Sequence, residues 1–187
     1  MLRVIGGTAG GRRLAGPGGL NLRPTAERVR EAFFNIVARQ VPGCVFIDLF
    51  AGTGAVGIEA LSRGAREVHF VEFHPAAVRL IRHNLERSGL GLCARVHRAD
   101  AVRWLAGRRP DAGLIFLDPP YGRGQALRAL SMAAGALMPG GLAVAETGVR
   151  EQPPERVGDL VLTRVERYGD TVLSFFGLER GTGTEKQ

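Results

Sequence analysis

Between residues 45 and 145, two kinds of hydrophobic pattern alternate, and this alternation restricts the possible folds more than any other feature of the chain. Short apolar runs typical of buried strands occur at residues 45–47, 68–71, 94–97, 114–117 and 142–145. Segments with the apolar spacing of helices lie between them, at residues 55–63, 75–87, 102–105 and 125–137. Strands that alternate with helices build a parallel sheet covered on both faces. We therefore predict an α/β fold with right-handed crossovers.

The two ends of the chain depart from this alternation. Residues 160–165 and 172–176 have strand-like patterns, and the gap between them is too short for a crossover helix. They predict a terminal hairpin in which one strand runs antiparallel to the sheet. Near the N-terminus, residues 4–5 resemble a short strand, and residues 6–19 are rich in glycine and arginine, which indicates a hairpin or a mobile arm. Thr25 is the predicted N-cap of the helix that follows.

We expect three segments within the 187 residues: a basic N-terminal arm or hairpin at 1–24, an α/β domain at 25–178 and a flexible tail at 179–187. No apolar run is long enough to span a membrane, and the N-terminus lacks the apolar core of a signal peptide. Cys44 and Cys93 are isolated from each other and from any histidine cluster. We therefore expect reduced thiols, no metal site and a cytoplasmic location.

The charge of the chain favours an anionic partner, nucleic acid first. The net charge is +7 and the isoelectric point is about 10.8. Residues 1–40 hold seven arginines against two glutamates, which is most of the excess. Arginine forks match phosphate groups, so we predict RNA contacts in this region, although a solvated basic surface is the alternative for each side chain. The predicted phosphate-binding residues are Arg12, Arg13, Arg23, Arg28 and Arg30.

A glycine-rich segment follows the first strand of the alternating region and opens a helix. Gly52, Gly54 and Gly57 satisfy the spacing G-x-G-x-x-G, and Glu72 stands 20 residues beyond Gly52 at the end of the next strand. By that rule alone, the segment is a dinucleotide-binding fingerprint. Glycines at these positions allow the backbone to approach a ligand closely.

Three successive strands are predicted to end in acids, namely Asp48, Glu72 and Asp100. Asp48 would face a pyrophosphate unfavourably, which argues against a nicotinamide cofactor. An adenosine ligand with a sulfonium and an α-amino group suits these acids better. Glu72 would accept the ribose hydroxyls, Asp100 the adenine amine, and Asp48 would lie near the amino-acid portion; capping or solvation of each acid is the alternative. We predict S-adenosylmethionine, bound by Thr25, Asp48, Phe50, Ala51, Gly52, Thr53, Gly54, Glu72, Phe73, Asp100 and Ala101.

The segment Asp118-Pro119-Pro120-Tyr121 directly follows the apolar run at 114–117. The two prolines remove two backbone donors, and the residue before each proline is held in an extended conformation. The carbonyls and the Asp118 carboxylate are left to accept hydrogen bonds, and the Tyr121 ring offers a flat face. Together these groups suit a nucleobase with an exocyclic NH2, so all four residues are predicted to be catalytic. A proline-rich turn that merely ends a strand is the alternative.

These motifs resemble those of class I S-adenosylmethionine-dependent methyltransferases, in particular the subset with the catalytic motif (D/N)-P-P-(Y/F), which methylates exocyclic amines. More specifically, the chain resembles the RsmD family of bacterial 16S rRNA (guanine-N2)-methyltransferases. Members of that family often carry Ser at the position of Thr53 and Phe at the position of Tyr121. The matching stretches are Arg3–Gly7, Gly10–Leu14, Arg23–Thr25, Arg28–Glu31, Phe34–Asn35, Asp48–Gly52, Glu59–Ala65 and Asp118–Tyr121.

The resemblance implies methyl transfer to the N2 amine of a guanine in small-subunit rRNA, either naked or in an assembling 30S particle. It also implies a Rossmann-like, seven-stranded, mostly parallel sheet with an antiparallel last strand. We expect a monomer. The alternatives are a methyltransferase for other exocyclic amines of DNA or RNA (adenine N6 or cytosine N4), a protein-amide methyltransferase, a nicotinamide oxidoreductase and a non-catalytic RNA-binding module.

Overall fold

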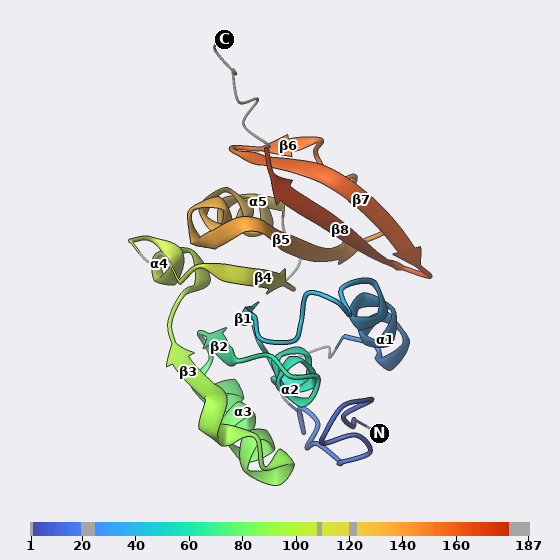
Figure 1. Cartoon of the computed structure of the whole chain (residues 1–187), viewed down its shortest axis with the longest axis vertical. Coiled ribbons are helices and arrows are strands. Elements are labelled where there is room, and N and C mark those ends of the chain that lie inside the picture. Colours follow the sequence, from blue (N-terminus) through green and yellow to red (C-terminus); the bar gives the residue numbers. More distant parts are fainter. Residues whose placement is uncertain (1, 20–24, 108–109, 120–122, 180–187) are drawn as a thin grey trace.

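The computed structural model describes residues 2–19, 25–107, 110–119 and 123–179 of the chain. In this part of the chain, eight strands form a single sheet (Figure 1). They are β1 (Val45–Leu49), β2 (Glu67–Glu72), β3 (Ala94–Arg98), β4 (Ala112–Leu117), β5 (Leu137–Gly148), β6 (Arg156–Val157), β7 (Leu160–Tyr168) and β8 (Thr171–Leu178). Their order across the sheet is β3-β2-β1-β4-β5-β8-β7-β6. Strands β1 to β5 are parallel to one another, whereas β8 pairs antiparallel with β5.

Helices cover both faces of this sheet (Figure 1). They are α1 (Glu27–Ile36), α2 (Ala55–Ser62), α3 (Pro75–Ser88), α4 (Ala101–Leu105) and α5 (Arg123–Ala133), with short 3-10 turns η1 (Gly91–Cys93) and η2 (Ala134–Ala136). Buried side chains of α1, α2 and α3 join one core cluster, and those of α4 and α5 join a second. No helix in the described ranges is long and apolar enough to cross a membrane.

The predicted alternation of strands and helices is confirmed, but the expected number of seven strands is wrong. The additional strand is β6, whose two residues pair with Leu160 and Val161 of β7. Two residues are too few to display an alternation of apolar and polar side chains, so periodicity could not reveal this strand. The predicted terminal hairpin is confirmed, because β7 and β8 pair antiparallel and only Gly169 and Asp170 separate them.

The N-terminal segment forms a hairpin that packs on the rest of the protein. Val4 donates its N–H to the Arg12 carbonyl at 2.9 Å. The strand predicted at 4–5 is wrong, because the segment contributes only an isolated bridge between Arg3 and Arg13 in the part that is described. Its apolar side chains share the core cluster of α1 and α2; they are Val4, Ala9 and Leu14.

Glu59 on α2 is a fully buried carboxylate that fastens this hairpin. Its two oxygens accept the backbone N–H groups of Ile5 and Gly6 at 2.7 and 2.9 Å. Arg63, one turn later, donates to the same carboxylate at 2.7 Å. The buried guanidinium of Arg30, from α1, lies 3.9 Å away. A buried carboxylate needs such partners, and here they join three segments of the chain.

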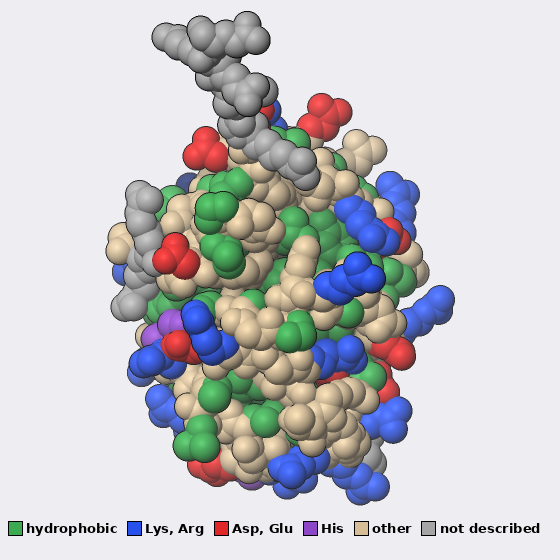
Figure 2. Space-filling view, in the orientation of Figure 1, with side chains coloured by type: hydrophobic (Ala, Val, Ile, Leu, Met, Phe, Trp, Pro, Cys, Tyr) green, Lys and Arg blue, Asp and Glu red, His purple; other side chains and the backbone are tan. Residues whose placement is uncertain are grey.

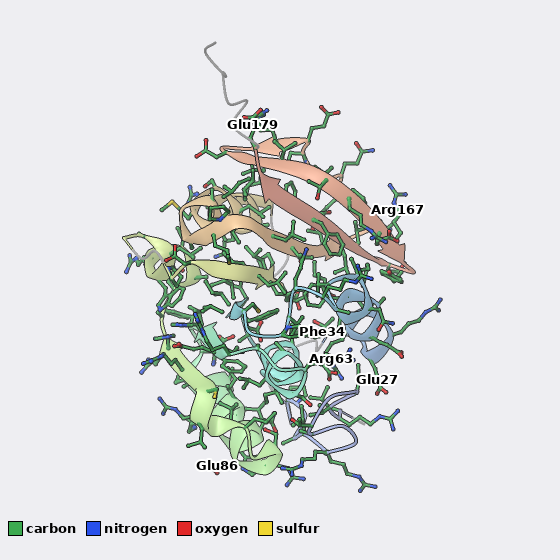
Figure 3. The ribbon with its side chains drawn as sticks, in the orientation of Figure 1. Glu27, Phe34, Arg63, Glu86, Arg167 and Glu179 are labelled. Carbon is green, nitrogen blue, oxygen red and sulfur yellow. The ribbon has the colours of Figure 1, made fainter. Side chains whose placement is uncertain are left out.

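An aromatic cluster positions α1 over the sheet. The ring centroid of Phe33 lies 4.8 Å from that of Phe34 and 4.9 Å from that of Phe116 on β4. The guanidinium of Arg63 covers the ring of Phe34, 5.1 Å from its centroid (Figure 3). The prediction that Thr25 caps this helix is wrong, since Ala26 is the N-cap residue and makes no side-chain cap bond. Thr25 is buried instead.

Candidate active site

A cleft of about 740 Å³ opens at the carboxyl ends of the parallel strands. This is the edge at which sheets of this kind bind their ligands. All of the predicted cofactor-binding residues except Gly54 line the cleft, and so do Asp118 and Pro119. Arg23, Pro120 and Tyr121 lie outside the described residues. The part of the site that is described therefore brings the predicted cofactor residues and the predicted catalytic acid into one cavity.

The turn between β1 and α2 has an unusual backbone. Phe50 adopts a positive φ of 59°, which is uncommon for a residue other than glycine, and Gly52 has a φ of 53°. A Cβ placed on Gly52 would meet nothing closer than 3.9 Å, so this face of the turn is open to a ligand. The N–H of Gly52 donates to Glu72 at 2.9 Å, which ties the turn to the end of β2.

The other two glycines of the motif serve packing. A Cβ on Gly54 would lie 3.2 Å from the side chain of Ile81, and Gly54 is not among the residues that line the cleft, so its contact with the cofactor stays a prediction. A Cβ on Gly57 would lie 2.3 Å from the ring of Phe70. These two glycines allow α2 to approach α3 and β2 closely, which is the role of the third glycine in such fingerprints.

Asp48 is almost completely buried at the end of β1. Its Oδ2 accepts the N–H of Gly57 at 2.9 Å. Burial raises the pKa of its carboxyl to about 8, and the nearby Glu72 carboxylate acts in the same direction, whereas the Gly57 hydrogen bond opposes the shift. Asp48 is therefore largely protonated at neutral pH. A cation bound beside it would favour its ionised form.

Glu72 and Asp100 are held by backbone groups. Glu72 accepts the N–H groups of Gly52 and His74, at 2.9 and 2.7 Å, through different oxygens. Oδ1 of Asp100 caps α4 by accepting the N–H of Arg103 at 2.9 Å, so the capping alternative for this acid is observed. Phe73, next to Glu72, lines the cleft and leaves 71% of its surface exposed, so a large aromatic face is available to a ligand.

A buried asparagine connects the N-terminal hairpin to the turn between β1 and α2. Nδ2 of Asn84, on α3, donates to the carbonyls of Ala15 and Thr53 at 3.1 and 3.0 Å. Its Oδ1 accepts the N–H of Ala15 at 2.7 Å. Thr53 lines the cleft. Sequence analysis missed Asn84, because a single polar residue on a helix carries no signal of its partners.

The far wall of the cleft, beyond Asp118, was also missed from the sequence. It is formed by the end of β5 and by the turn between β7 and β8, and its residues include Glu146, Thr147, Asp170 and Thr171. These positions carry no recognisable motif, and only the order of the strands places them beside Asp118. The described lining contains acids and no arginine; the acids are Asp48, Glu72, Asp100, Asp118, Glu146, Glu151 and Asp170. No group of His, Cys, Asp and Glu among the described residues has the arrangement of a metal site.

The arginines predicted to bind phosphate lie in different environments. Arg12, Arg13 and Arg28 are exposed. Arg30 has no exposed surface, and its Nη2 donates to the Arg3 carbonyl at 2.6 Å, so its predicted contact with RNA is wrong. Figure 2 shows that arginines on the surface are spread over the whole height of this face.

Arg12 and Arg28 differ in their position relative to the cleft. Arg12 donates to the carbonyl of Ser88 at the C-terminal end of α3. Because α3 connects the parallel strands β2 and β3, this end lies away from the cleft. Arg28, in contrast, follows Ala26 by two residues, and Ala26 lines the cleft. Contact of either arginine with RNA remains a prediction, and Arg28 is the better placed for a substrate that enters the cleft.

Comparison with known proteins identifies similar chains along almost the whole length. The family model described as "Conserved hypothetical protein 95" matches residues 2–177. "Putative rRNA methyltransferase YlbH" of Bacillus subtilis (strain 168) is 41% identical over 181 residues, which cover 94% of this chain and 98% of that protein. "Ribosomal RNA small subunit methyltransferase D" of Escherichia coli (strain K12) is 40% identical over 124 residues, which cover 66% of this chain and 62% of that protein. The solved structure "Putative methyltransferase yhhF from Escherichia coli" superposes with a TM-score of 0.85 at 30% identity, over 95% of this chain and 98% of that chain.

Proposed function

The chain belongs to the family described as Conserved hypothetical protein 95, which is the RsmD family of methyltransferases, and on this premise we propose that it methylates the exocyclic N2 amine of a guanine in small-subunit rRNA. It is an S-adenosylmethionine-dependent RNA methyltransferase. The name of the Escherichia coli relative supports the choice of small-subunit rRNA. The observation that carries the proposal is that Asp118 and Pro119 line the same cleft as the acids at the ends of β1 and β2.

The residues of the cleft fit the cofactor. When bound, S-adenosylmethionine supplies a methyl group activated by a sulfonium. Glu72, oriented by two backbone N–H groups, keeps lone pairs that can accept ribose hydroxyls. The exposed ring of Phe73 offers a face for adenine, and Gly52 permits close approach of the backbone. Asp48 supplies an acid for the positively charged α-amino group.

The end of β4 holds the target amine. The lone pair of a nucleobase amine is delocalised into the ring, so the amine is a weak nucleophile. The Asp118 carboxylate and the Pro119 carbonyl accept its two N–H bonds, which turns the lone pair toward the methyl donor. Alignment of this kind contributes several kcal/mol in well-oriented reactions, on the order of 7–11 kcal/mol at most. The proton lost from the amine passes to Asp118 or to water.

The distribution of charge supports entry of a single base. An acidic lining repels phosphate, so the RNA backbone stays outside while an unstacked base enters. Three exposed arginines lie within three residues of the lining in sequence, and they serve as phosphate contacts at the mouth: Arg28 on α1, Arg150 after β5 and Arg167 near the end of β7. Figure 3 labels Arg167. Single-stranded loops present bases in this way, whereas paired stems do not.

The experiment that tests this function uses small-subunit rRNA from cells that lack the gene, both naked and in assembled particles. The purified protein and labelled S-adenosylmethionine are added, and nucleosides are identified by mass spectrometry. We expect N2-methylguanosine at one position. N6-methyladenosine, N4-methylcytosine or no transfer to either substrate would contradict the proposal.

Asp118→Ala tests the role of the catalytic acid. We expect this variant to lose methyl transfer and to bind S-adenosylmethionine with unchanged affinity, because the cofactor is held by other strands. Single-turnover rates and calorimetric titration measure the two properties separately. Normal turnover in the variant would remove Asp118 from the mechanism.

A further inference from the structure

Glu146 is a second acid beside Asp118. Strands β4 and β5 pair in parallel with Leu117 opposite Ala145, so Asp118 and Glu146 are the next residues on neighbouring strands. Side chains alternate along strands, and Phe116 and Val144, two residues earlier, lie in the core cluster under α1 and α2. Asp118 and Glu146 therefore continue on that same face of the sheet.

The two acids also share the cleft. Both residues line it, and Oε2 of Glu146 is buried from solvent. Glu146 comes from the wall opposite the residues assigned to the cofactor, together with Glu151 and Asp170. Two ring nitrogens, N1 and N3, flank the N2 amine of guanine, and a base whose amine is held by Asp118 and Pro119 can turn N1 toward the β5 side of the cleft.

That neighbouring atom distinguishes the bases that carry an amine. In adenine and cytosine, the ring nitrogen next to the amine on the Watson–Crick edge is an acceptor. In guanine, the corresponding atom is N1, which carries a hydrogen. An ionised carboxylate can only accept hydrogen bonds. It pairs with the guanine N1–H and meets the lone pair of an adenine or cytosine nitrogen unfavourably.

We propose that Glu146 is the specificity-determining residue for guanine, accepting the N1–H while Asp118 and the Pro119 carbonyl hold the N2 amine. This inference rests on the proposed function and deepens it. A hydrogen bond between the N1–H and a charged acceptor discriminates against a base without that hydrogen by roughly 10- to 150-fold. The acidic surroundings act in the same direction, because guanine offers consecutive donors along this edge.

The test replaces the target guanine, once mapped, with 2-aminopurine in an RNA fragment. This base keeps the amine and has an acceptor at N1 in place of the N1–H. We measure kcat/KM for methyl transfer to each RNA. Independently, the fluorescence of 2-aminopurine gives the Kd of the substituted RNA, and competition gives the Kd of the guanine RNA. The wild type should prefer guanine by roughly 10- to 150-fold in kcat/KM. Glu146→Gln should reduce this preference at least tenfold, because its amide can donate to the 2-aminopurine N1.

Glu155→Gln is the matched control, since Glu155 is exposed and does not line the cleft. It should keep the preference of the wild type. Titration with S-adenosylmethionine shows whether the Glu146→Gln site is intact, and a purely structural role would lower transfer to both RNAs without changing their ratio. Equal use of both bases by the wild type, or an unchanged ratio in Glu146→Gln, overturns this inference alone. Transfer to adenine or cytosine in rRNA overturns the proposed function and the inference together.

Discussion

We predict that the ionisation of Asp48 makes cofactor binding depend on pH in a defined direction. With its pKa raised to about 8 by burial, Asp48 in the unliganded protein is ionised in about one molecule in ten at pH 7 and one in a hundred at pH 6. If the cationic α-amino group of the cofactor binds beside Asp48 as proposed, its binding favours the ionised form of Asp48 and releases the proton. The affinity for S-adenosylmethionine should therefore rise roughly tenfold per pH unit, about 1.4 kcal/mol, as the pH approaches 8 from below.

Isothermal titration between pH 5.5 and 7.5 measures this dependence in a range where the ligand amine is mainly charged. Buffers with different ionisation enthalpies report the number of protons released, which should approach one. Asp48→Asn keeps an acceptor for the Gly57 N–H and removes the ionisation, so its affinity should be nearly independent of pH. A flat profile for the wild type, or the same slope in Asp48→Asn, would refute this account of Asp48.

The same shift affects stability. The folded protein keeps the Asp48 proton up to about pH 8, whereas the unfolded chain loses it near 3.8. The stronger binding of the Asp48 proton by the folded protein contributes to the free energy of unfolding. This contribution is fully present below the pKa of Asp48 in the unfolded chain, and it is lost as the pH rises through the pKa in the folded protein. Asp48→Asn should therefore show a smaller decline in stability between pH 4 and pH 8. Urea unfolding at several pH values measures the difference.

Three further predictions concern packing and RNA binding. Glu59→Ala should destabilise the protein by about 3–5 kcal/mol, because it leaves the buried guanidinium of Arg30 without its counter-charge and two backbone N–H groups without their acceptor; a loss under about 1 kcal/mol in urea unfolding would contradict this. Gly57→Ala should cost about 1–3 kcal/mol through overpacking, whereas Gly135→Ala, where a Cβ meets nothing within 4 Å, should not; equal unfolding midpoints would argue against the close packing. Arg28→Gln should reduce the slope of log K for RNA binding against log salt concentration, by up to about 0.9 for a lost duplex phosphate contact, more than Arg12→Gln does; the reverse order in binding titrations would place the RNA nearer the end of α3 that Arg12 contacts.

The parts of the fold that could be predicted from the sequence are those whose signal is local. The alternation of apolar runs identifies the parallel sheet, and it places Asp48, Glu72 and Asp118 at strand ends along one edge. The motif of residues 118–121 owes its visibility to the same local character. Strand β6 escaped prediction because two residues carry no period.

The parts that escaped depend on contacts between distant segments. Arg30 belongs to a basic stretch and resembles its neighbours in sequence, yet it is buried because α1 packs against Glu59 on α2. Glu146 reaches the cleft because β5 pairs with β4, a fact about strand order. Gly54 fits a ligand-binding spacing, but the side chain that it accommodates comes from α3.

Asn84 has a consequence for how this protein is truncated or tagged. Through this one side chain, hydrogen bonds connect Ala15 of the N-terminal hairpin to Thr53 in the turn between β1 and α2. A chain that starts at residue 25 would lose these hydrogen bonds to the hairpin as well as several arginines. Deletion of the hairpin would thus remove contacts that support the turn between β1 and α2 in the predicted active site, and any resulting defect in RNA binding could not be assigned to missing charge alone. Point replacements of single arginines separate the two effects.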